Sequence, residues 1–373
     1  MNRRRFKNYN CTGCAACQAV CPMNAINMEI DEEGFIQPRI SETCTECGLC
    51  EKICRNRFLA ENDRFDNCEI YATWSKDGGI RLQSTSGGTF SELARIVFRR
   101  NGCVIGAAYN ADLSVSHAMI WNESELDKIR RSKYVQSNNG IIFRLIRENL
   151  EKGVLTLYCG TPCQIAGLRT YLPAKNYDNL ILIDFICRGV NSYKAFKSWL
   201  KEYEIIENAS VKHVWFKNKI NGWKKSPYCT QLEFDNNKTI VISDNQNLYM
   251  QCYLQDNLII RPCCGECEFK GYPRQGDITL GDFWGADPDI NDDKGTSIVL
   301  INSSRGRRIL DILKDEQRLE IVPRYNTNIE CYNPQFFNSV VRSEYSSLFL
   351  RLLDYMSFSD ALEEILRLKN AKD

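Results

Sequence analysis

Short apolar stretches and amphipathic stretches alternate through the middle of the chain. Residues 70–74, 103–108, 116–121, 154–158 and 180–186 are rich in apolar residues and have the length of strands. After them, residues 89–97, 141–151 and 165–171 have the apolar spacing and length of helices. Strands that alternate with helices predict an α/β fold, and such folds assemble their sites from the loops at strand ends.

The two ends of the chain have different patterns. Residues 26–30 alternate with the strand period and precede a turn sequence and a second short strand, which predicts a small hairpin. The polar residues 61–67 predict a linker. Residues 305–313 and 346–368 have helical apolar spacing and predict helices that serve packing. We therefore expect a mixed α/β (α+β) protein with an N-terminal module (1–64), a larger mixed α/β domain (65–310) and a C-terminal helical extension (311–373).

Charge and composition exclude several classes of function. The 373 residues include 48 basic and 47 acidic side chains, so the chain lacks the electrostatic footprint of a protein that binds nucleic acid or an anionic membrane. No apolar run approaches the roughly 18–20 residues that span a bilayer. The start of the sequence has no apolar signal core, and 19 cysteines indicate a reducing compartment. We expect a cytoplasmic protein without a membrane span.

One cysteine motif occurs twice in the first 54 residues. Its spacing is C-x2-C-x2-C-x3-C, and each cysteine of the second copy follows its counterpart by 33 residues. In this bacterial pattern three cysteines bind one 4Fe-4S cluster, while the fourth, expected at a helix start, binds the other cluster. The sequence therefore predicts two 4Fe-4S clusters, one held by Cys11, Cys14, Cys17 and Cys54, and one held by Cys44, Cys47, Cys50 and Cys21.

Zinc and disulfide alternatives fit this motif less well. Zinc sites usually combine two cysteine pairs or cysteine with histidine, and no histidine precedes His117. A disulfide framework would require an oxidising compartment. The segment resembles the two-cluster bacterial ferredoxins over its whole length.

A third group of cysteines is spread over the larger domain. Cys163 and Cys187 follow predicted strands, and Cys264 and Cys267 form a C-x2-C pair that supplies only two ligands by itself. These four are candidates for a third cluster, and buried free thiols are the alternative. The buried-thiol interpretation fits five further cysteines well, namely Cys68, Cys103, Cys229, Cys252 and Cys331.

A small glycine-rich turn precedes the helix predicted at residues 89–97. Such a turn presents backbone N–H groups and the positive end of a helix dipole, which suit a phosphate, although an ordinary loop and helix cap explains it as well. The sequence contains no G-x-G-x-x-G, no G-x4-G-K-[ST] and no G-x-S-x-G motif. Dinucleotide-binding Rossmann, P-loop and hydrolase functions therefore lack support.

Five motifs in a fixed order resemble one family. They are Ser86-Gly87-Gly88, residues 133–137 (KYVQS), residues 160–164 (GTPCQ), Cys187-Arg188-Gly189, and Cys264-x2-Cys267 followed by residues 281–285 (GDFWG). Over roughly residues 65–300 the chain resembles the beta-subunit family of coenzyme F-420 hydrogenases and dehydrogenases. The resemblance implies an FAD-containing iron–sulfur flavoprotein, whose relatives reduce a deazaflavin coenzyme or chlorophyll precursors, or belong to surface-polysaccharide pathways.

The resemblance also implies roles for individual residues. Cys163, Cys187, Cys264 and Cys267 would bind a cluster beside the flavin, with Cys159 and Cys263 as weaker candidates for the same set. The residues implied to line the FAD are Ser86, Gly87, Gly88, Thr89, Lys133, Gln136 and Ser137. Where relatives often have histidine after the equivalent of Cys187, this chain has Arg188, so a proton-transfer role there is in doubt.

Two kinds of function fit these cofactors. In the first, an oxidoreductase passes single electrons from a ferredoxin-like donor through the clusters to FAD and on to a small organic substrate. In the second, the chain is an electron-transfer subunit that serves a partner redox enzyme and has no substrate of its own. A third, redox-sensing or structural function would need neither flavin nor turnover. The sequence names no catalytic residue, because Asp282 is equally well explained as a turn residue.

Overall fold

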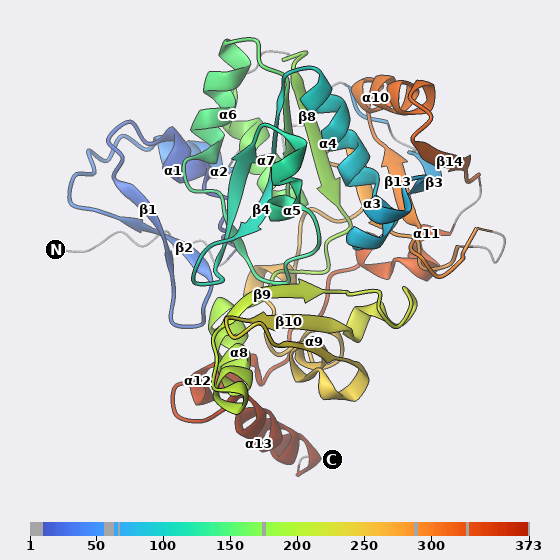
Figure 1. The fold of residues 1–373 in the computed structure, drawn as a ribbon. Helices are drawn as coiled ribbons and strands as arrows, with labels where there is room; N and C mark the ends of the chain where they lie inside the picture. The colour runs from blue at the N-terminus through green and yellow to red at the C-terminus, as the bar shows by residue number, and fades with distance from the viewer. Residues whose placement is uncertain are drawn as a thin grey trace.

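A nine-stranded mixed sheet forms the centre of the computed structural model, which describes residues 10–55, 63–65, 68–173, 177–286, 290–325 and 328–371 (Figure 1). The strand order is β14-β3-β13-β12-β8-β7-β4-β5-β6. The central strands β12, β8, β7 and β4 run parallel, whereas β3, β13 and β14 pair antiparallel at one end. The strands are β3 (Glu69–Ser75), β4 (Cys103–Tyr109), β5 (Val115–Ile120), β6 (Ser137–Asn138), β7 (Thr156–Cys159), β8 (Leu180–Phe185), β12 (Ile278–Asp282), β13 (Ser297–Ile301) and β14 (Leu319–Pro323).

Helices cover both faces of this sheet. Alternation along β13 directs Val299 and Ile301 into a core with α4 (Thr89–Arg99), α5 (Leu126–Ile129) and α10 (Ser304–Asp315). Ile298 and Leu300 belong to a separate core. Helices α6 (Ile142–Glu151) and α7 (Pro162–Tyr171) form a third core against β4, β7 and β8. The predicted mixed α/β fold is confirmed.

The N-terminal module packs on α6 and α7. It consists of α1 (Ala16–Val20), the hairpin of β1 (Ile26–Ile30) and β2 (Ile36–Ile40), and α2 (Leu49–Arg55). Ala16, Ala19 and Ile53 share a hydrophobic core with Phe143 and Ile165, so the module is joined to the larger domain by buried apolar surface. The hairpin was predicted from its period, and this prediction is confirmed.

The expected helix starts at the fourth cysteines are wrong. Helix α1 ends one residue before Cys21, and α2 contains both Cys50 and Cys54. The reason is the x3 spacing, which is one helical turn. Each short helix therefore contains the third cysteine of its run and covers the residues from there toward the fourth.

A second layer of structure lies below the large sheet in Figure 1. A three-stranded sheet, β11-β10-β9, shares one core with α8, α9, α12 and α13. The segment expected as one helical stretch at residues 346–368 is two helices, and the expected C-terminal extension also contributes β14 to the large sheet. The bounds are β9 (Val211–Phe216), β10 (Thr230–Phe234), β11 (Thr239–Ile242), α8 (Tyr193–Glu207), α9 (Leu248–Leu254), α12 (Ser346–Leu352) and α13 (Phe358–Asn370).

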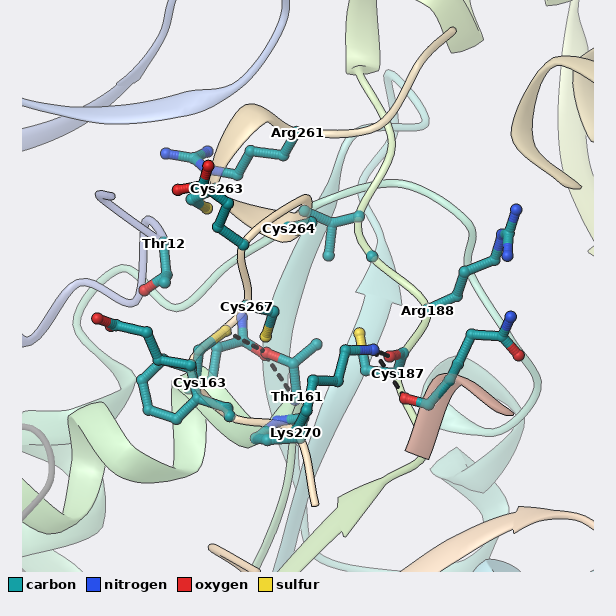
Figure 2. Close-up of a pocket in the computed structure, with 18 of the residues that line it drawn as sticks. Thr12, Thr161, Cys163, Cys187, Arg188, Arg261, Cys263, Cys264, Cys267 and Lys270 are labelled. Carbon is teal, nitrogen blue, oxygen red and sulfur yellow. Dashed lines mark hydrogen bonds between the residues drawn. The ribbon is translucent and has the colours of Figure 1, made fainter. Parts of the chain in front are cut away.

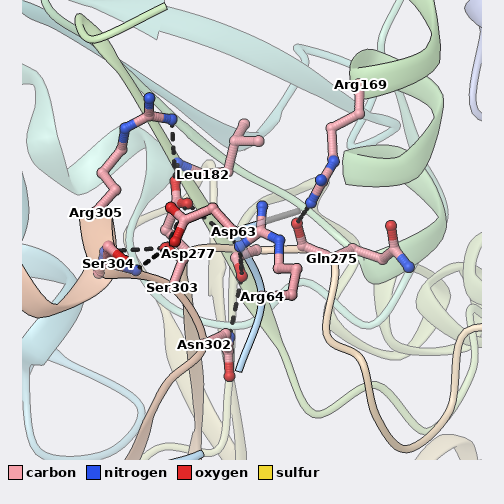
Figure 3. Close-up of polar contacts among 12 residues, drawn as sticks. Asp63, Arg64, Arg169, Leu182, Gln275, Asp277, Asn302, Ser303, Ser304 and Arg305 are labelled. Carbon is pink, nitrogen blue, oxygen red and sulfur yellow. Dashed lines mark hydrogen bonds and ion pairs between the residues drawn. The ribbon is translucent and has the colours of Figure 1, made fainter. Parts of the chain in front are cut away.

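A buried carboxylate anchors the chain that enters the large sheet. Asp277, 2% exposed, accepts hydrogen bonds from the Leu182 backbone N–H (2.9 Å) and the Ser303 hydroxyl (2.8 Å), and it pairs with Arg64 (3.3 Å) (Figure 3). Arg64 also donates to the Gly276 carbonyl at 2.8 Å. Most of the predicted linker 61–67 lies outside the described residues, but its part at 63–65 is held against the sheet. Among the described helices, none is both long and apolar enough to cross a bilayer.

Candidate functional site

Four N-terminal cysteines line one cavity with about 430 Å³ of open space. They are Cys11, Cys14, Cys17 and Cys54, the set that the repeat assigns to one cluster. Burial raises the pKa of Cys17, and the neighbouring thiols of Cys14, Cys11 and Cys54 raise it further. A group of crowded, buried thiols holds its negative form only when a metal supplies positive charge. The geometry therefore fits a metal cluster.

The second N-terminal set is more exposed to solvent. Cys47 is exposed, while Cys21, Cys44 and Cys50 are partly buried. Backbone N–H groups of Ala25 and Glu46 donate to the sulfurs of Cys21 (3.3 Å) and Cys44 (3.4 Å). N–H···S bonds of this kind tune iron–sulfur clusters. Burial and Cys44 raise the pKa of Cys50, and the packing of α1 on α2 joins the two cysteine runs.

The third group of cysteines lines a cavity with about 730 Å³ of open space, part of it continuous with solvent, where the larger domain meets the N-terminal module (Figure 2). Cys163 lies in the first turn of α7, which begins at Pro162 and not at Ile165 as expected, because Thr161 and Gln164 form a capping box. Cys187 follows β8, and the other members come from one segment. The cysteines that line the cavity are Cys163, Cys187, Cys263, Cys264 and Cys267.

Cys263 and Cys159, the two weaker candidates for the third cluster, lie in different places. Cys263 lines the same cavity as the four predicted ligands, whereas Cys159 lines a different cleft. Burial raises the pKa of Cys187 to about 11, and Lys270, which donates to the Cys187 carbonyl at 2.6 Å, opposes this increase. Within the described residues, no three Cys, His, Asp or Glu side chains are grouped for a single metal ion. The four thiolates that bind a 4Fe-4S cluster do not have to converge on a single metal ion, since each thiolate binds a different iron atom.

The buried-thiol prediction holds for part of the remaining cysteines. Cys103, Cys229 and Cys252 are buried in the core, and Cys68 is partly buried. For Cys331 the prediction is wrong, because this thiol is exposed on the short helix α11 (Ile329–Tyr332). The helix buries Ile329 instead.

A large cleft with about 1920 Å³ of open space, part of it continuous with solvent, adjoins the third cavity. It is lined by Ser86, Gly88 and Thr89 at the start of α4, whose first turn has no side-chain cap, and by Lys133 and Ser137. Two other residues implied to face FAD do not line it. Gly87 is packed against β3 and β13, where an added Cβ would lie 2.3 Å from the Thr73 carbonyl oxygen. The amide of Gln136 turns instead toward the N-terminal module.

One side of the cleft is strongly cationic. Arg130, Arg131 and Lys133 line it together, and the buried Nε of Arg130 has no hydrogen-bond partner among the described residues. Burial, together with the charge of Arg131, lowers the pKa of Lys133 to about 7. An unpartnered buried donor and crowded cations beside an uncapped helix N-terminus fit an anionic group such as a pyrophosphate.

The cleft also contains polar residues that the sequence did not single out. His117 lies between the Ser137 hydroxyl (2.8 Å) and the Cys159 carbonyl (3.1 Å), and burial lowers its pKa to about 4. Lys217 forms an ion pair with Asp282 and lies 4.7 Å from the ring centre of Trp284. No local motif marks His117 or Lys217, because their partners come from distant segments.

The cleft and the third cavity share a wall. Thr161, Gln164, Cys187, Arg188 and Gly189 line both spaces. The Arg188 guanidinium is held by the Leu254 carbonyl (2.9 Å) and the Asn257 side chain (2.7 Å). At its other end the cavity is lined by Thr12, the neighbour of Cys11. The third cysteine group therefore lies between the first N-terminal set and the cleft.

The fold and the cysteine sets define a mixed α/β protein joined to a two-cluster iron–sulfur module. Residues 10–59 match the 4Fe-4S dicluster domain, and residues 155–326 match the family described as the C terminus of the coenzyme F420 hydrogenase/dehydrogenase beta subunit. Over these residues the chain is similar to the beta subunits of the F420 hydrogenase/dehydrogenase family, with a match to a ferredoxin-type 4Fe-4S module in front. The resemblance and the module that the motifs predict are confirmed.

Two known proteins show the extent of the similarity. The chain is 24% identical to one subunit of the F(420)H(2) dehydrogenase of Methanosarcina mazei over 189 residues, which are 48% of this chain and 53% of that protein. It thus matches about half the length of this curated relative. A chain of the F420-reducing NiFe hydrogenase complex from Methanosarcina barkeri has a similar fold, with a TM-score of 0.50 at 15% identity over 73% of this chain and 88% of that chain.

Proposed function

We propose that this protein is an electron-transferring oxidoreductase subunit that links its iron–sulfur sites to an FAD bound in the large cleft and works with a partner redox enzyme. The observation that carries this proposal is the position of the third cysteine cavity, which shares Thr12 with the N-terminal module and Cys187 with the wall of the cleft. The named relatives, a dehydrogenase subunit and a hydrogenase complex, support a function within a larger assembly.

The three cysteine groups are proposed as ligands of three 4Fe-4S clusters. The first two sets are those of the N-terminal repeat, and the third is Cys163, Cys187, Cys264 and Cys267. Clusters of this type exchange single electrons, and a flavin exchanges them singly or in pairs. A row of sites that begins at the exposed Cys47 and ends at a buried cleft is the arrangement that such an exchange requires.

FAD is proposed for the cleft on the basis of its charge and shape. Its pyrophosphate would be held by the α4 N-terminus and by Arg130, Arg131 and Lys133. The wall shared with the third cavity would bring the flavin end close to Cys187. The chain's own contribution is to exclude water, to orient the cofactor and to supply fixed positive charge.

Reduction of a small organic substrate is the second candidate function, and the contact of the cleft with solvent favours it. Part of the cleft's open space of about 1920 Å³ is continuous with solvent, which would let a substrate reach a cofactor bound inside. The substrate would be either a deazaflavin coenzyme or an intermediate of a surface-polysaccharide pathway. The Lys217–Asp282 ion pair would then supply a charged contact for that substrate.

The test uses full-length protein purified without oxygen. Iron, acid-labile sulfide and released flavin are measured in the wild type, in Cys187→Ser and in the control Cys252→Ser, whose thiol is buried and lines neither the third cavity nor the cleft. About twelve irons and one FAD in the wild type, with about four irons fewer in Cys187→Ser alone, support the proposal. About eight irons without flavin would refute the third cluster and the flavin site. Turnover of a small molecule without any partner protein would favour the second candidate.

A further inference from the structure

A single buried guanidinium connects the first N-terminal cysteine set to the third cavity. Arg261 is 1% exposed and immediately precedes the Pro262–Cys264 turn. Its Nε donates to the Cys11 carbonyl at 3.0 Å and its Nη1 to the Gln136 side-chain oxygen at 2.7 Å. The same side chain lines the third cavity, and Figure 2 shows it with Cys263 at the end where Thr12 lies.

Gln136 completes this contact from the larger domain. Its side-chain oxygen accepts from the Ile36 N–H (2.9 Å) as well as from Arg261, and its Nε2 donates to the Thr12 carbonyl (3.2 Å). Gly13 leaves room for this amide, because a Cβ at that position would lie 2.5 Å from the Gln136 Nε2. The loop that carries Cys11 is thus held by two hydrogen bonds, one from Arg261 to the Cys11 carbonyl and one from Gln136 to the Thr12 carbonyl.

One nitrogen of the Arg261 guanidinium has no acceptor in the described part of the chain. The buried Nη2 has no hydrogen-bond partner among the described residues. A buried charged donor without an acceptor is costly. The guanidinium carbon lies 5.7 Å from the ring centre of Phe35, and the Arg261 side chain also lines the cysteine cavity, so a group that fills this cavity would be able to supply the missing acceptor.

A second arginine provides a contrast. Arg144 donates to the carbonyls of Ala19 (2.9 Å), Gln18 (2.9 Å) and Cys21 (2.8 Å), so it also holds the N-terminal module on the larger domain. It does not line the third cavity. Arg144 is therefore a docking residue, and Arg261 combines docking with a charge between two sites.

We propose that Arg261 is a positioning residue that couples the first N-terminal cluster to the third cluster by placing one fixed positive charge between them. The proposal rests on the proposed function, since it requires both clusters. Each cluster gains one electron and one negative charge on reduction, so the guanidinium favours the reduced state of both. Its free N–H would donate to a sulfur of the third cluster, which also favours the reduced state.

The test is a redox titration of the anaerobic full-length protein with dithionite, followed by electron paramagnetic resonance. The variants are Arg261→Met, Arg261→Gln, Arg261→Lys and the control Arg144→Met, and Cys187→Ser identifies the signal of the third cluster. In Arg261→Met and Arg261→Gln we expect the equilibrium constant for reduction of the third cluster to fall at least about tenfold, which is 59 mV for one electron. Arg261→Lys should retain most of the wild-type potential, and Arg144→Met should retain all of it.

Unchanged potentials in neutral variants that keep their iron would overturn the proposal. If both neutral variants lose the third-site iron while Arg144→Met keeps it, Arg261 has a structural role only, and the electrostatic proposal also fails. Failure of the proposed function looks different, because the wild type itself would then lack the third cluster.

Discussion

The position and pKa of Lys133 predict that anion binding in the cleft depends on pH. Its Nζ donates to the Arg130 carbonyl at 2.6 Å, and burial beside Arg131 lowers its pKa from 10.5 to about 7. Above pH 7 the lysine of the empty cleft is therefore mostly neutral. A bound phosphate raises the pKa again, so binding takes up a proton and weakens as the pH increases. The neighbouring His117 and Cys159, with pKa values of about 4 and about 12, do not titrate in this range.

The size of the effect follows from the pKa shift. Each pKa unit that the bound anion restores corresponds to about 1.4 kcal/mol, or a factor of ten in affinity. If the pyrophosphate restores one to two of the units lost on burial, Lys133 contributes about 10- to 100-fold to binding below pH 7. Above pH 7 the affinity should fall toward about tenfold per pH unit. The stability of the empty protein has the opposite trend, because the charged lysine destabilises the fold below pH 7 and this penalty is relieved between pH 7 and 10.5.

Isothermal titration calorimetry of flavin-stripped protein measures both the affinity for the anion and the number of protons taken up on binding. FAD and ADP are titrated at pH values between about 6.5 and 9 in two buffers of different ionisation heat, which gives the protons taken up. Lys133→Met should bind about 10- to 100-fold more weakly and lose most of the pH dependence. Lys219, whose pKa is also about 7, donates to the carbonyl of the cleft residue Ser86 and titrates in the same range. The control is Lys128→Met, since Lys128 is an exposed lysine paired with Glu125 outside the cleft lining. Equal affinities at both ends of the pH range, or wild-type binding by Lys133→Met, would refute the role given to this lysine.

Two further predictions concern packing. Asp277→Ala leaves the Leu182 N–H and Arg64 without their buried acceptor, so it should lower the free energy of unfolding by about 3–5 kcal/mol. Denaturant titration measures this loss, with Asp178→Ala at an exposed position as the control. A loss below about 1 kcal/mol would contradict the prediction. Gly167→Ala adds a Cβ 2.9 Å from the Cys14 sulfur. Overpacking of about 1–3 kcal/mol should exceed the helix-propensity gain of about 1 kcal/mol. Thermal stability and iron content should both fall, unlike in Gly78→Ala, where the added Cβ meets open space; wild-type values for both would disprove the clash.

The sequence predicted correctly those helices and strands whose own residues show a clear hydrophobic pattern. The strands at residues 154–158 and 180–186 are found within two residues, because buried central strands are apolar throughout. The hairpin at residues 26–30 and the helix after Gly88 were equally clear from their periods. Wrong boundaries arose where a side chain decided the start of a helix. Asp77 caps α3 (Gly78–Gln83), a helix that is missing from the predicted elements, and Thr161 starts α7 before its apolar residues begin.

The candidate site was predictable only as far as its ligands follow a fixed spacing. The first set of cysteines lines one cavity, as the repeat requires, and the iron content measures their ligation. The FAD contacts were less certain, since a motif gives the residues but not the direction of their side chains. Gln136 belongs to the motif at residues 133–137, yet its amide binds the Cys11 loop and Arg261.

Contacts between the module and the larger domain had no local signal at all. Arg261 and Cys11 are separated by 250 positions, and neither the cysteine spacing nor the periodicity relates them. Their contact exists because Ala16, Ala19 and Ile53 of the module are buried against α6 and α7, and this burial brings the Cys11 loop to the Pro262–Cys264 turn. A module that was held only by a linker could exchange electrons without such contacts. The buried arginine and the shared cavity therefore argue that the N-terminal module functions as a fixed part of one redox unit.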